Sequence, residues 1–207
     1  MRFLFSKERR ERAKEKRDWG RHGDKVSKIT FLKETDLQKA SKIGDARHVL
    51  ELLRDVNLDV NAQRDDGATA LWLASSNGHV AVVRALLLHR KVDVNLQINE
   101  DVKPYYGGET AHKGATALYV ASSYGHVEVV HALLQHHMVD VNLRSAYGAT
   151  ALYVACEEGH LEVVRELLQH YNVDVHLQSN YGATALDMAY SRENSDLARL
   201  LEDYMTR

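Results

Sequence analysis

The sequence has few of the features that mark disulfide-bonded, secreted or membrane proteins. A single cysteine, Cys156, excludes an internal disulfide framework and indicates a reducing compartment. No uninterrupted apolar run approaches the length of a membrane-spanning helix, and the apolar group Phe3, Leu4 and Phe5 is too short for a signal-peptide core. We therefore expect an intracellular protein, cytoplasmic or nuclear, that is neither secreted nor transmembrane.

Charge of both signs is present, but the two signs are unevenly distributed. Residues 1–34 contain 12 Lys and Arg against 6 Asp and Glu, whereas the remainder contains 15 against 23. The chain thus joins a basic arm of net charge +6 to an acidic body of net charge −8. The composition as a whole, 44% hydrophobic and 27% charged, is ordinary for a globular protein.

What the sequence does contain is an internal repeat. The phrase GATAL occurs four times at intervals of 47, 34 and 34 residues, beginning at Gly67, Gly114, Gly148 and Gly182. A Gly-His phrase such as YGHVEVVHALL, from Tyr124, follows three of these copies, and VDVN or VDVH then ends the unit. LDVN at 58–61 ends an earlier, degenerate copy. The first interval is 13 residues longer than the others, which predicts an insertion.

Each unit is typical of two short antiparallel helices and a loop. In the third unit, Thr116 can cap a helix that Gly125 ends, and a second helix follows. The apolar residues of that second helix suit one face: Val127, Val129, Val130, Leu133 and Leu134. Because so small a helix pair cannot bury its apolar face alone, we expect neighbouring units to stack on one another.

The unit resembles the ankyrin repeat, with its T-P-L-H-x-A phrase, its central Gly-His and its closing D-V-N. The resemblance implies an all-α solenoid over residues 35–207, made of five helix-turn-helix units with β-hairpin-like finger loops and a polar cap at each end. The family's Pro is Ala here, and one extra residue before VD predicts a reshaped turn. The family's His becomes Trp72, Tyr119, Tyr153 and Asp187 here, and the aromatic residues among them predict a stacked column in its place.

The insertion, at about residues 98–110, extends one of the finger loops. It contains the only proline, Pro104, followed by Tyr105, Tyr106 and a Gly-Gly turn signal. Paired exposed tyrosines are typical of binding hot spots, so the insertion is a candidate contact. The alternative is a tolerated surface insertion, since long loops cost little stability.

Residues that could support catalysis or metal binding each have a structural interpretation that we favour. His79, His126 and His160 lie one repeat apart, too far to share an ion, and the sequence HALLQHH lacks the spacing of a helical zinc site. Cys156 takes the place of small serines in sister repeats. We expect no enzymatic activity, no cofactor and no metal.

The basic arm, residues 1–34, is expected to be a solvated charged helix with Glu-Arg and Glu-Lys pairs. The alternatives are a nuclear-import patch, a contact with an anionic membrane, or binding of nucleic acid. In each of these, the arm would dock and the solenoid would act as an adaptor.

The resemblance implies that a partner protein lies along the concave face formed by the finger tips and the first helices. The candidate contacts are the two residues before each repeat glycine and the two before each Gly-His, together with the tyrosines of the insertion. This set is Asp65, Asp66, Ser76, Asn77, Tyr105, Tyr106, His112, Lys113, Ser123, Tyr124, Tyr147, Glu157, Glu158, Asn180 and Tyr181. We predict a non-catalytic protein-binding scaffold whose tyrosines are the main anchors.

Overall fold

The structure is a computed structural model that describes residues 34–99 and 113–206. By its internal contacts the chain divides into Met1–Leu32 and Lys33–Arg207, and every described residue belongs to the second unit. The predicted helical arm over residues 1–34 therefore lies, except for Glu34, outside the described residues.

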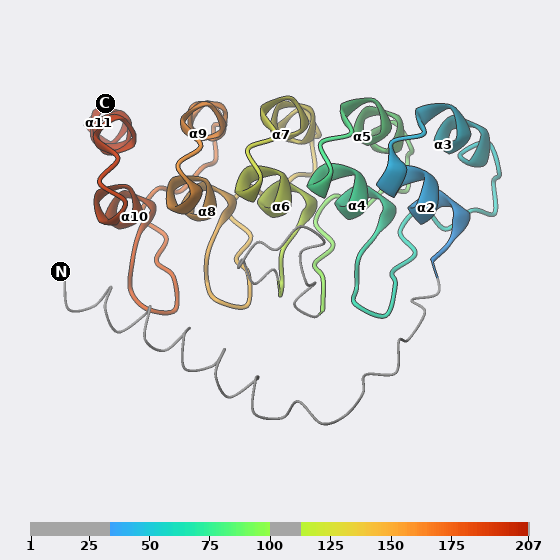
Figure 1. Ribbon diagram of the computed structural model, residues 1–207, viewed down its shortest axis with the longest axis horizontal. Coiled ribbons are helices and arrows are strands. Elements are labelled where there is room, and N and C mark those ends of the chain that lie inside the picture. The colour runs from blue at the N-terminus through green and yellow to red at the C-terminus, as the bar shows by residue number, and fades with distance from the viewer. Residues whose placement is uncertain (1–33, 100–112, 207) are drawn as a thin grey trace, which may run out of the picture. The chain divides into compact units, whose positions relative to one another are not determined.

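Within the described residues, ten helices form five consecutive pairs. The first helices of the pairs are α2 (Asp36–Ile43), α4 (Ala70–Ser76), α6 (Ala117–Ser123), α8 (Ala151–Glu158) and α10 (Ala185–Ser191). The second helices are α3 (Ala46–Leu52), α5 (Val80–Leu87), α7 (Val127–Leu134), α9 (Leu161–Leu168) and α11 (Ser195–Met205). Each helix packs on the corresponding helix of the next pair, so the first helices form one row and the second helices another (Figure 1). The predicted all-α solenoid of stacked helix pairs is confirmed.

A threonine begins every first helix. Thr116 Oγ1 accepts the backbone N–H of Tyr119 at 3.1 Å, as the sequence predicted. The same cap recurs in the other four repeats, at Thr35, Thr69, Thr150 and Thr184. Such a cap contributes about 1 kcal/mol because it satisfies a backbone donor that has no partner inside the helix.

A glycine and a histidine join neighbouring repeats at the ends of α2, α4 and α6. The imidazole of His126 lies against Gly78, where its Nε2 donates to the Ser76 carbonyl at 3.2 Å. A Cβ atom on Gly78 would lie 2.9 Å from that ring, and the glycine has φ 72°, so both space and backbone conformation require glycine. Gly44 with His79 and Gly125 with His160 repeat the arrangement.

The core lies between the two rows of helices and between successive repeats. Val129, Val130 and Leu133 of α7 are fully buried, as expected for its apolar face. Trp72, Tyr119 and Tyr153 are buried at one equivalent position in the three inner repeats. The end repeats have hydrogen-bonding side chains at this position, at Gln38, which donates to the Ala62 and Ala68 carbonyls, and at Asp187, which caps α10.

Side chains close the turns that follow the second helices of the first four repeats, where the extra residue predicts a reshaped turn. In three repeats a histidine Nδ1 accepts the N–H of the residue two positions on, at 3.3–3.4 Å, in His89, His136 and His170. Asp55 does the same in the first repeat, accepting from Asn57 at 2.9 Å. A side-chain acceptor thus closes the turn where a helix-ending glycine is expected.

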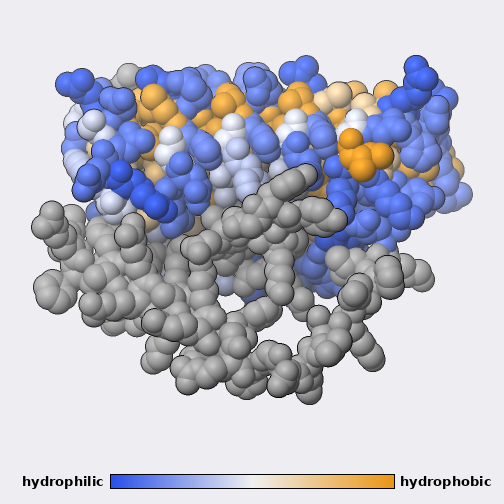
Figure 2. Space-filling view, viewed as in Figure 1, coloured by the Kyte–Doolittle hydropathy of each residue, from blue (hydrophilic) through white to orange (hydrophobic). Residues whose placement is uncertain are grey.

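The surface of the visible face is mainly polar, with apolar residues showing along the rows of helices (Figure 2). Some large apolar side chains are strongly exposed, and they are considered below. In the described part of the chain, no helix has both the length and the apolar character that crossing a membrane requires.

Candidate functional site

The finger loops connect each repeat to the next first helix. In the fingers before α4, α8 and α10, two backbone hydrogen bonds close a tight turn; in the fourth repeat, Ser145 N–H donates to the Ala149 carbonyl and Gly148 N–H to the Ser145 carbonyl. The fingers bond to one another as well, because Ala146 N–H donates to the Lys113 carbonyl at 2.9 Å and Asn180 N–H to the Tyr147 carbonyl at 2.9 Å. The fingers are therefore turns, and one backbone hydrogen bond links each of these neighbouring pairs. The described residues include no strand.

Long polar side chains connect the fingers further. Gln63 Nε2 donates to the Gln97 carbonyl at 3.2 Å, and Gln97 Nε2 donates to the Arg144 carbonyl at 2.9 Å. Arg144 replaces the glutamine in the next repeat, and its Nη2 donates to the Gln178 carbonyl at 2.8 Å. The finger tips are thus held in fixed register, which lowers the entropy that a bound partner would have to remove.

The finger that carries the insertion has the same base as the others. Ile98, which is buried, donates its N–H to the Ala115 carbonyl at 3.1 Å, and Gly114 N–H donates back to Ile98 at 2.9 Å. Arg64 and Ala68 make the equivalent pair in the preceding finger. By this register, Asn99 and Lys113 flank the extra residues, which are 100–112.

A buried ion-pair group holds the base of the first complete finger. The guanidinium of Arg64 pairs with both Glu34 and Asp66, and Asp66 Oδ1 also accepts the Ala68 N–H at 3.0 Å. Burial alone would lower the pKa of Arg64, but the bonds to the two carboxylates outweigh it and raise that pKa. Asp66 is therefore a structural residue of the finger, and its buried side chain is not on the contact surface.

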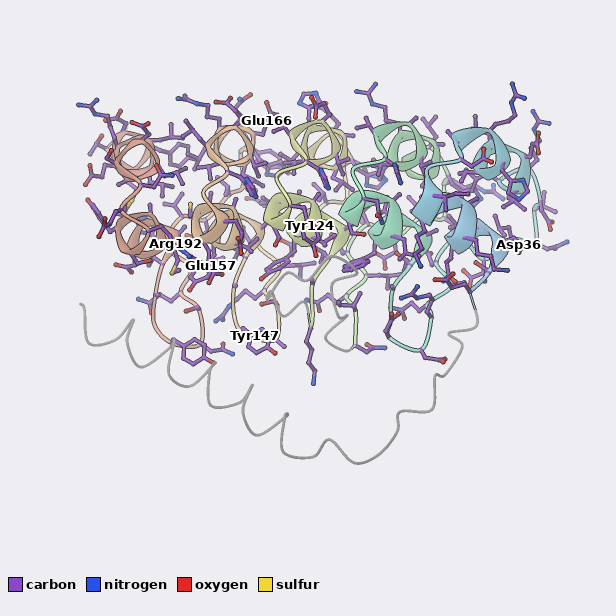
Figure 3. All side chains as sticks on the ribbon, viewed as in Figure 1. Asp36, Tyr124, Tyr147, Glu157, Glu166 and Arg192 are labelled. Atoms are coloured by element: carbon purple, nitrogen blue, oxygen red, sulfur yellow. The ribbon has the colours of Figure 1, made fainter. Side chains whose placement is uncertain are left out.

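The last turn of each first helix presents the second set of candidate residues. Asn77, Tyr124 and Glu158 are exposed at equivalent positions of α4, α6 and α8. Of the positions just before them, Ser76 and Glu157 are half-buried, whereas Ser123 is buried and does not reach the surface. Figure 3 shows Glu157 beside Arg192, and Tyr147 on the finger below the row of first helices.

A family model described as ankyrin repeats (3 copies) matches residues 23–145, 97–179 and 138–206, which is most of the chain. The chain belongs to the ankyrin repeat family. Ankyrin repeats are generally protein–protein interaction modules. A curated relative, cortactin-binding protein 2 from Saimiri boliviensis boliviensis, is 43% identical over 53 residues, or 26% of this chain. The chain spans only 3% of the length of that relative.

The ankyrin solenoid places the remaining predicted contacts as follows. Asp65, Lys113 and Asn180 are exposed at the finger tips, and Tyr147 and Tyr181 are half-buried there. Tyr105, Tyr106 and His112 lie outside the described residues. We call the surface made by the finger tips and the last turns of the first helices the finger face.

Sequence reasoning missed the residues of both end repeats at this position of the finger face, Ile43, which is 73% exposed directly before Gly44, and Arg192. Arg192 is exposed at the position of α10 that matches Asn77, Tyr124 and Glu158. Its Nη2 lies 3.9 Å from Glu157 Oε1, with 42% of the Arg192 side chain exposed. The last repeat lacks Gly-His, so this position could have been found only by counting 34 residues on from Glu158.

The side chains considered for catalysis or metal binding lie in environments that indicate a structural role. Cys156 is fully buried, and burial raises the pKa of its thiol to about 12, so the reactive thiolate is scarce near neutral pH. Among the described residues, no group of three or more His, Cys, Asp or Glu is arranged to hold a metal ion. His79, His126 and His160 each bond to a backbone carbonyl of the preceding repeat.

Proposed function

We propose that this ankyrin solenoid is a non-catalytic scaffold that binds another protein along its finger face. Membership of a family whose repeats generally bind proteins supports the class of function. The residues of the finger face support the location, because they are the exposed and variable members of an otherwise regular structure.

The observation that carries the proposal is the contrast between one variable position and its constant neighbours. The exposed position is occupied by Asn77, Tyr124, Glu158 and Arg192 in four successive repeats. Two residues earlier, the inner repeats have small and fully buried side chains, at Ser75, Ser122 and Cys156. Packing therefore fixes the neighbours but leaves this row free to differ, which is what selective binding of one partner needs.

Tyrosines are the expected anchors of the contact. Tyr124 is 37% exposed, and Tyr147 and Tyr181 are half-buried on adjacent fingers. A tyrosine supplies a large contact area at a low entropy cost because it has two rotatable bonds. Truncation of such an anchor in an interface costs about 2 kcal/mol or more.

Differential capture from cell extract tests the proposal. The wild type is compared with a double variant, Tyr124→Asn with Glu158→Asn, in which asparagine is the residue that the second repeat already has at Asn77. The matched control is Leu50→Asn, at an exposed apolar residue of the second helix α3 that belongs neither to the finger face nor to the turns after the second helices. Proteins lost only from the double variant are the predicted partners. A set of captured proteins unchanged by the double variant would rule out this face.

The insertion is tested by deleting residues 100–112. Because Asn99 and Lys113 then stand directly before Gly114, the finger regains the length of the Asp65-Asp66-Gly67 finger. We expect the shortened chain to keep its thermal unfolding midpoint. Partners that bind through the insertion should be lost, and a tolerated surface insertion would leave the captured set intact.

The alternative function places the contact in the basic arm, on nucleic acid or an anionic membrane, with the solenoid as adaptor. The arm lies outside the described residues apart from Glu34. Its excess of Lys and Arg predicts binding that falls steeply with salt and disappears when residues 1–34 are deleted. Binding of the intact chain to RNA or anionic vesicles at two salt concentrations measures this directly.

A further inference from the structure

The turns that follow the second helices carry a row of strongly exposed apolar side chains. We call residues 54–57, 88–91, 135–138 and 169–172 the turn row. Each of these four consecutive turns presents one large apolar side chain to solvent, namely Val56 at 81%, Leu88 at 86%, Met138 at 62% and Tyr171 at 89% exposed. They stand at different positions of the turn, the first for Leu88, the third for Val56 and Tyr171 and the fourth for Met138, but together they give four neighbouring repeats an exposed apolar group at the same edge.

These turns are rigid, which distinguishes them from ordinary mobile loops. The side chain of Asp55, His89, His136 or His170 closes each turn from within. Asparagines of the preceding repeats hold three of the turns from outside. Asn61 Nδ2 donates to the Lys91 carbonyl at 2.7 Å, Asn95 Nδ2 to the Met138 carbonyl at 2.8 Å, and Asn142 Nδ2 to the Asn172 carbonyl at 2.7 Å. Apolar groups fixed in this way are preorganised for contact.

A parallel row of carboxylates follows the turn row, two residues after the end of each turn. It consists of one exposed aspartate in each of the same repeats, at Asp59, Asp93, Asp140 and Asp174. In each aspartate, Oδ1 accepts the N–H of the residue two positions on at 2.9–3.0 Å, so its orientation is fixed. Among the described residues, no ion pair reaches any of these carboxylates.

The charge of this edge differs between its two halves. The turns of the first two repeats also carry Arg54, Arg90 and Lys91, which offset their aspartates. In the third and fourth repeats, the segments 135–142 and 169–176 contain no Lys or Arg, and Asp140 and Asp174 are their only formally charged residues. The attraction for a cationic partner is therefore concentrated around Met138 and Tyr171.

We infer that the turn row is a second docking surface, separate from the finger face, and that it binds a basic amphipathic helix of a protein partner. Apolar side chains of that helix contact Leu88, Met138 and Tyr171, and its Lys or Arg residues face the row of aspartates. The spacing matches, because neighbouring repeats lie about 10 Å apart and seven residues of an α-helix span about 10.5 Å. One apolar residue per two helical turns can therefore meet each repeat.

The charges favour this occupant over two others. An anionic membrane that approached Met138 and Tyr171 would also meet the fixed carboxylates of Asp140 and Asp174, which repel acidic headgroups. A second copy of the chain would bring the two rows of aspartates towards each other. A basic helix instead finds both its apolar face and its charges complemented.

The sister repeats supply a test that preserves the fold. Leu88→Gln, Met138→Asn and Tyr171→His each introduce the residue that another repeat has at the same position, in Gln135, Asn172 and His137. The triple variant should therefore keep the thermal unfolding midpoint of the wild type. A phage-displayed library of randomised peptides is selected on the wild-type chain, and synthetic copies of the selected peptides are then titrated by calorimetry.

The expected result is a class of selected peptides with more Lys and Arg than Asp and Glu. These peptides should become helical on binding, bind the triple variant at least tenfold more weakly, and retain full affinity for the Tyr124→Asn, Glu158→Asn variant. That variant tests the finger face separately, so the two proposals can fail independently.

The inference is overturned if no selected peptide distinguishes the triple variant from the wild type, or if those that do are acidic or extended. It is also overturned if the triple substitution abolishes binding to vesicles of phosphatidylcholine and phosphatidylserine, which would assign the row to a membrane. Loss of a wild-type dimer in sedimentation of the triple variant would assign it to a second copy.

Discussion

Replacement of a single glycine by alanine measures how strongly neighbouring repeats depend on the Gly-His contact. Gly125 has φ 74°, and a Cβ atom there would lie 2.7 Å from Nδ1 of His160. Gly159 occupies the same position one repeat later with φ 84°, but the nearest atom to its Cβ would be Asn194 Nδ2 at 3.7 Å. Gly159→Ala is therefore a matched control with the same strained backbone and no steric conflict.

The magnitudes follow from the two environments. Both alanines are placed in the left-handed backbone region, which costs about 1–2 kcal/mol. Gly125→Ala must also displace the His160 ring, whose Nε2 donates to the Ser123 carbonyl at 3.0 Å. Loss of that hydrogen bond adds about 1 kcal/mol. We expect a loss in free energy of unfolding of about 2–3 kcal/mol for Gly125→Ala, against about 1–2 kcal/mol for Gly159→Ala.

Urea unfolding of the full chain, followed by circular dichroism, measures both values. A third comparison isolates the contribution of the His160 ring. In a His160→Asn background, which copies the Asn194 of the last repeat, the cost of Gly125→Ala should fall to that of Gly159→Ala. Equal costs for the two alanines in the wild-type background would refute the reasoning, because backbone strain alone would then explain both.

Three further perturbations test other parts of the structure. Glu193→Gly relieves the only left-handed non-glycine residue among those described, at φ 57°, and should stabilise the chain by about 0.5 kcal/mol in urea unfolding. Asn95→Ala removes the hydrogen bond that Asn95 Nδ2 donates to the Met138 carbonyl at 2.8 Å and the one that its Oδ1 accepts from the Asp140 N–H at 3.0 Å. The free energy of unfolding should therefore fall by about 1–2 kcal/mol. An unchanged free energy would show that water replaces these bonds. The thiol of Cys156, with its pKa raised to about 12, should react with a thiol reagent at pH 8 only as fast as the chain opens, and rapid labelling of the folded protein would contradict its burial.

Much of the fold could be predicted because residues that recur at the same position of successive repeats indicate a shared structural role. Thr116 and Gly125 were assigned as the start and end of a helix because the same residues recur in the same register, and the structure has α6 between them. The reshaped turn stays a prediction, but the structure shows that a side-chain acceptor closes this turn in four repeats. Its mechanism could not be predicted, because a histidine Nδ1 that accepts a backbone N–H depends on the side-chain rotamer and not on residue type alone.

The candidate site was less accessible to sequence reasoning. Counting positions identified which residues vary, but it did not tell which of them point outwards. Asp66 folds back to pair with Arg64, and Ser123 is buried as well, although both were predicted as contacts. Gln97 and Arg144 were not predicted. Each links its finger to the next through a long side chain, and whether that side chain reaches the next finger depends on the distance between the repeats in space.

The most direct test of the proposed function is the affinity of one isolated partner, obtained by the differential capture, for the wild type and the Tyr124→Asn, Glu158→Asn variant. Isothermal titration measures the dissociation constant of each. We predict binding at least tenfold weaker for the variant, with the Leu50→Asn control at the wild-type value. Equal dissociation constants for all three proteins would contradict the assignment of partner binding to the finger face.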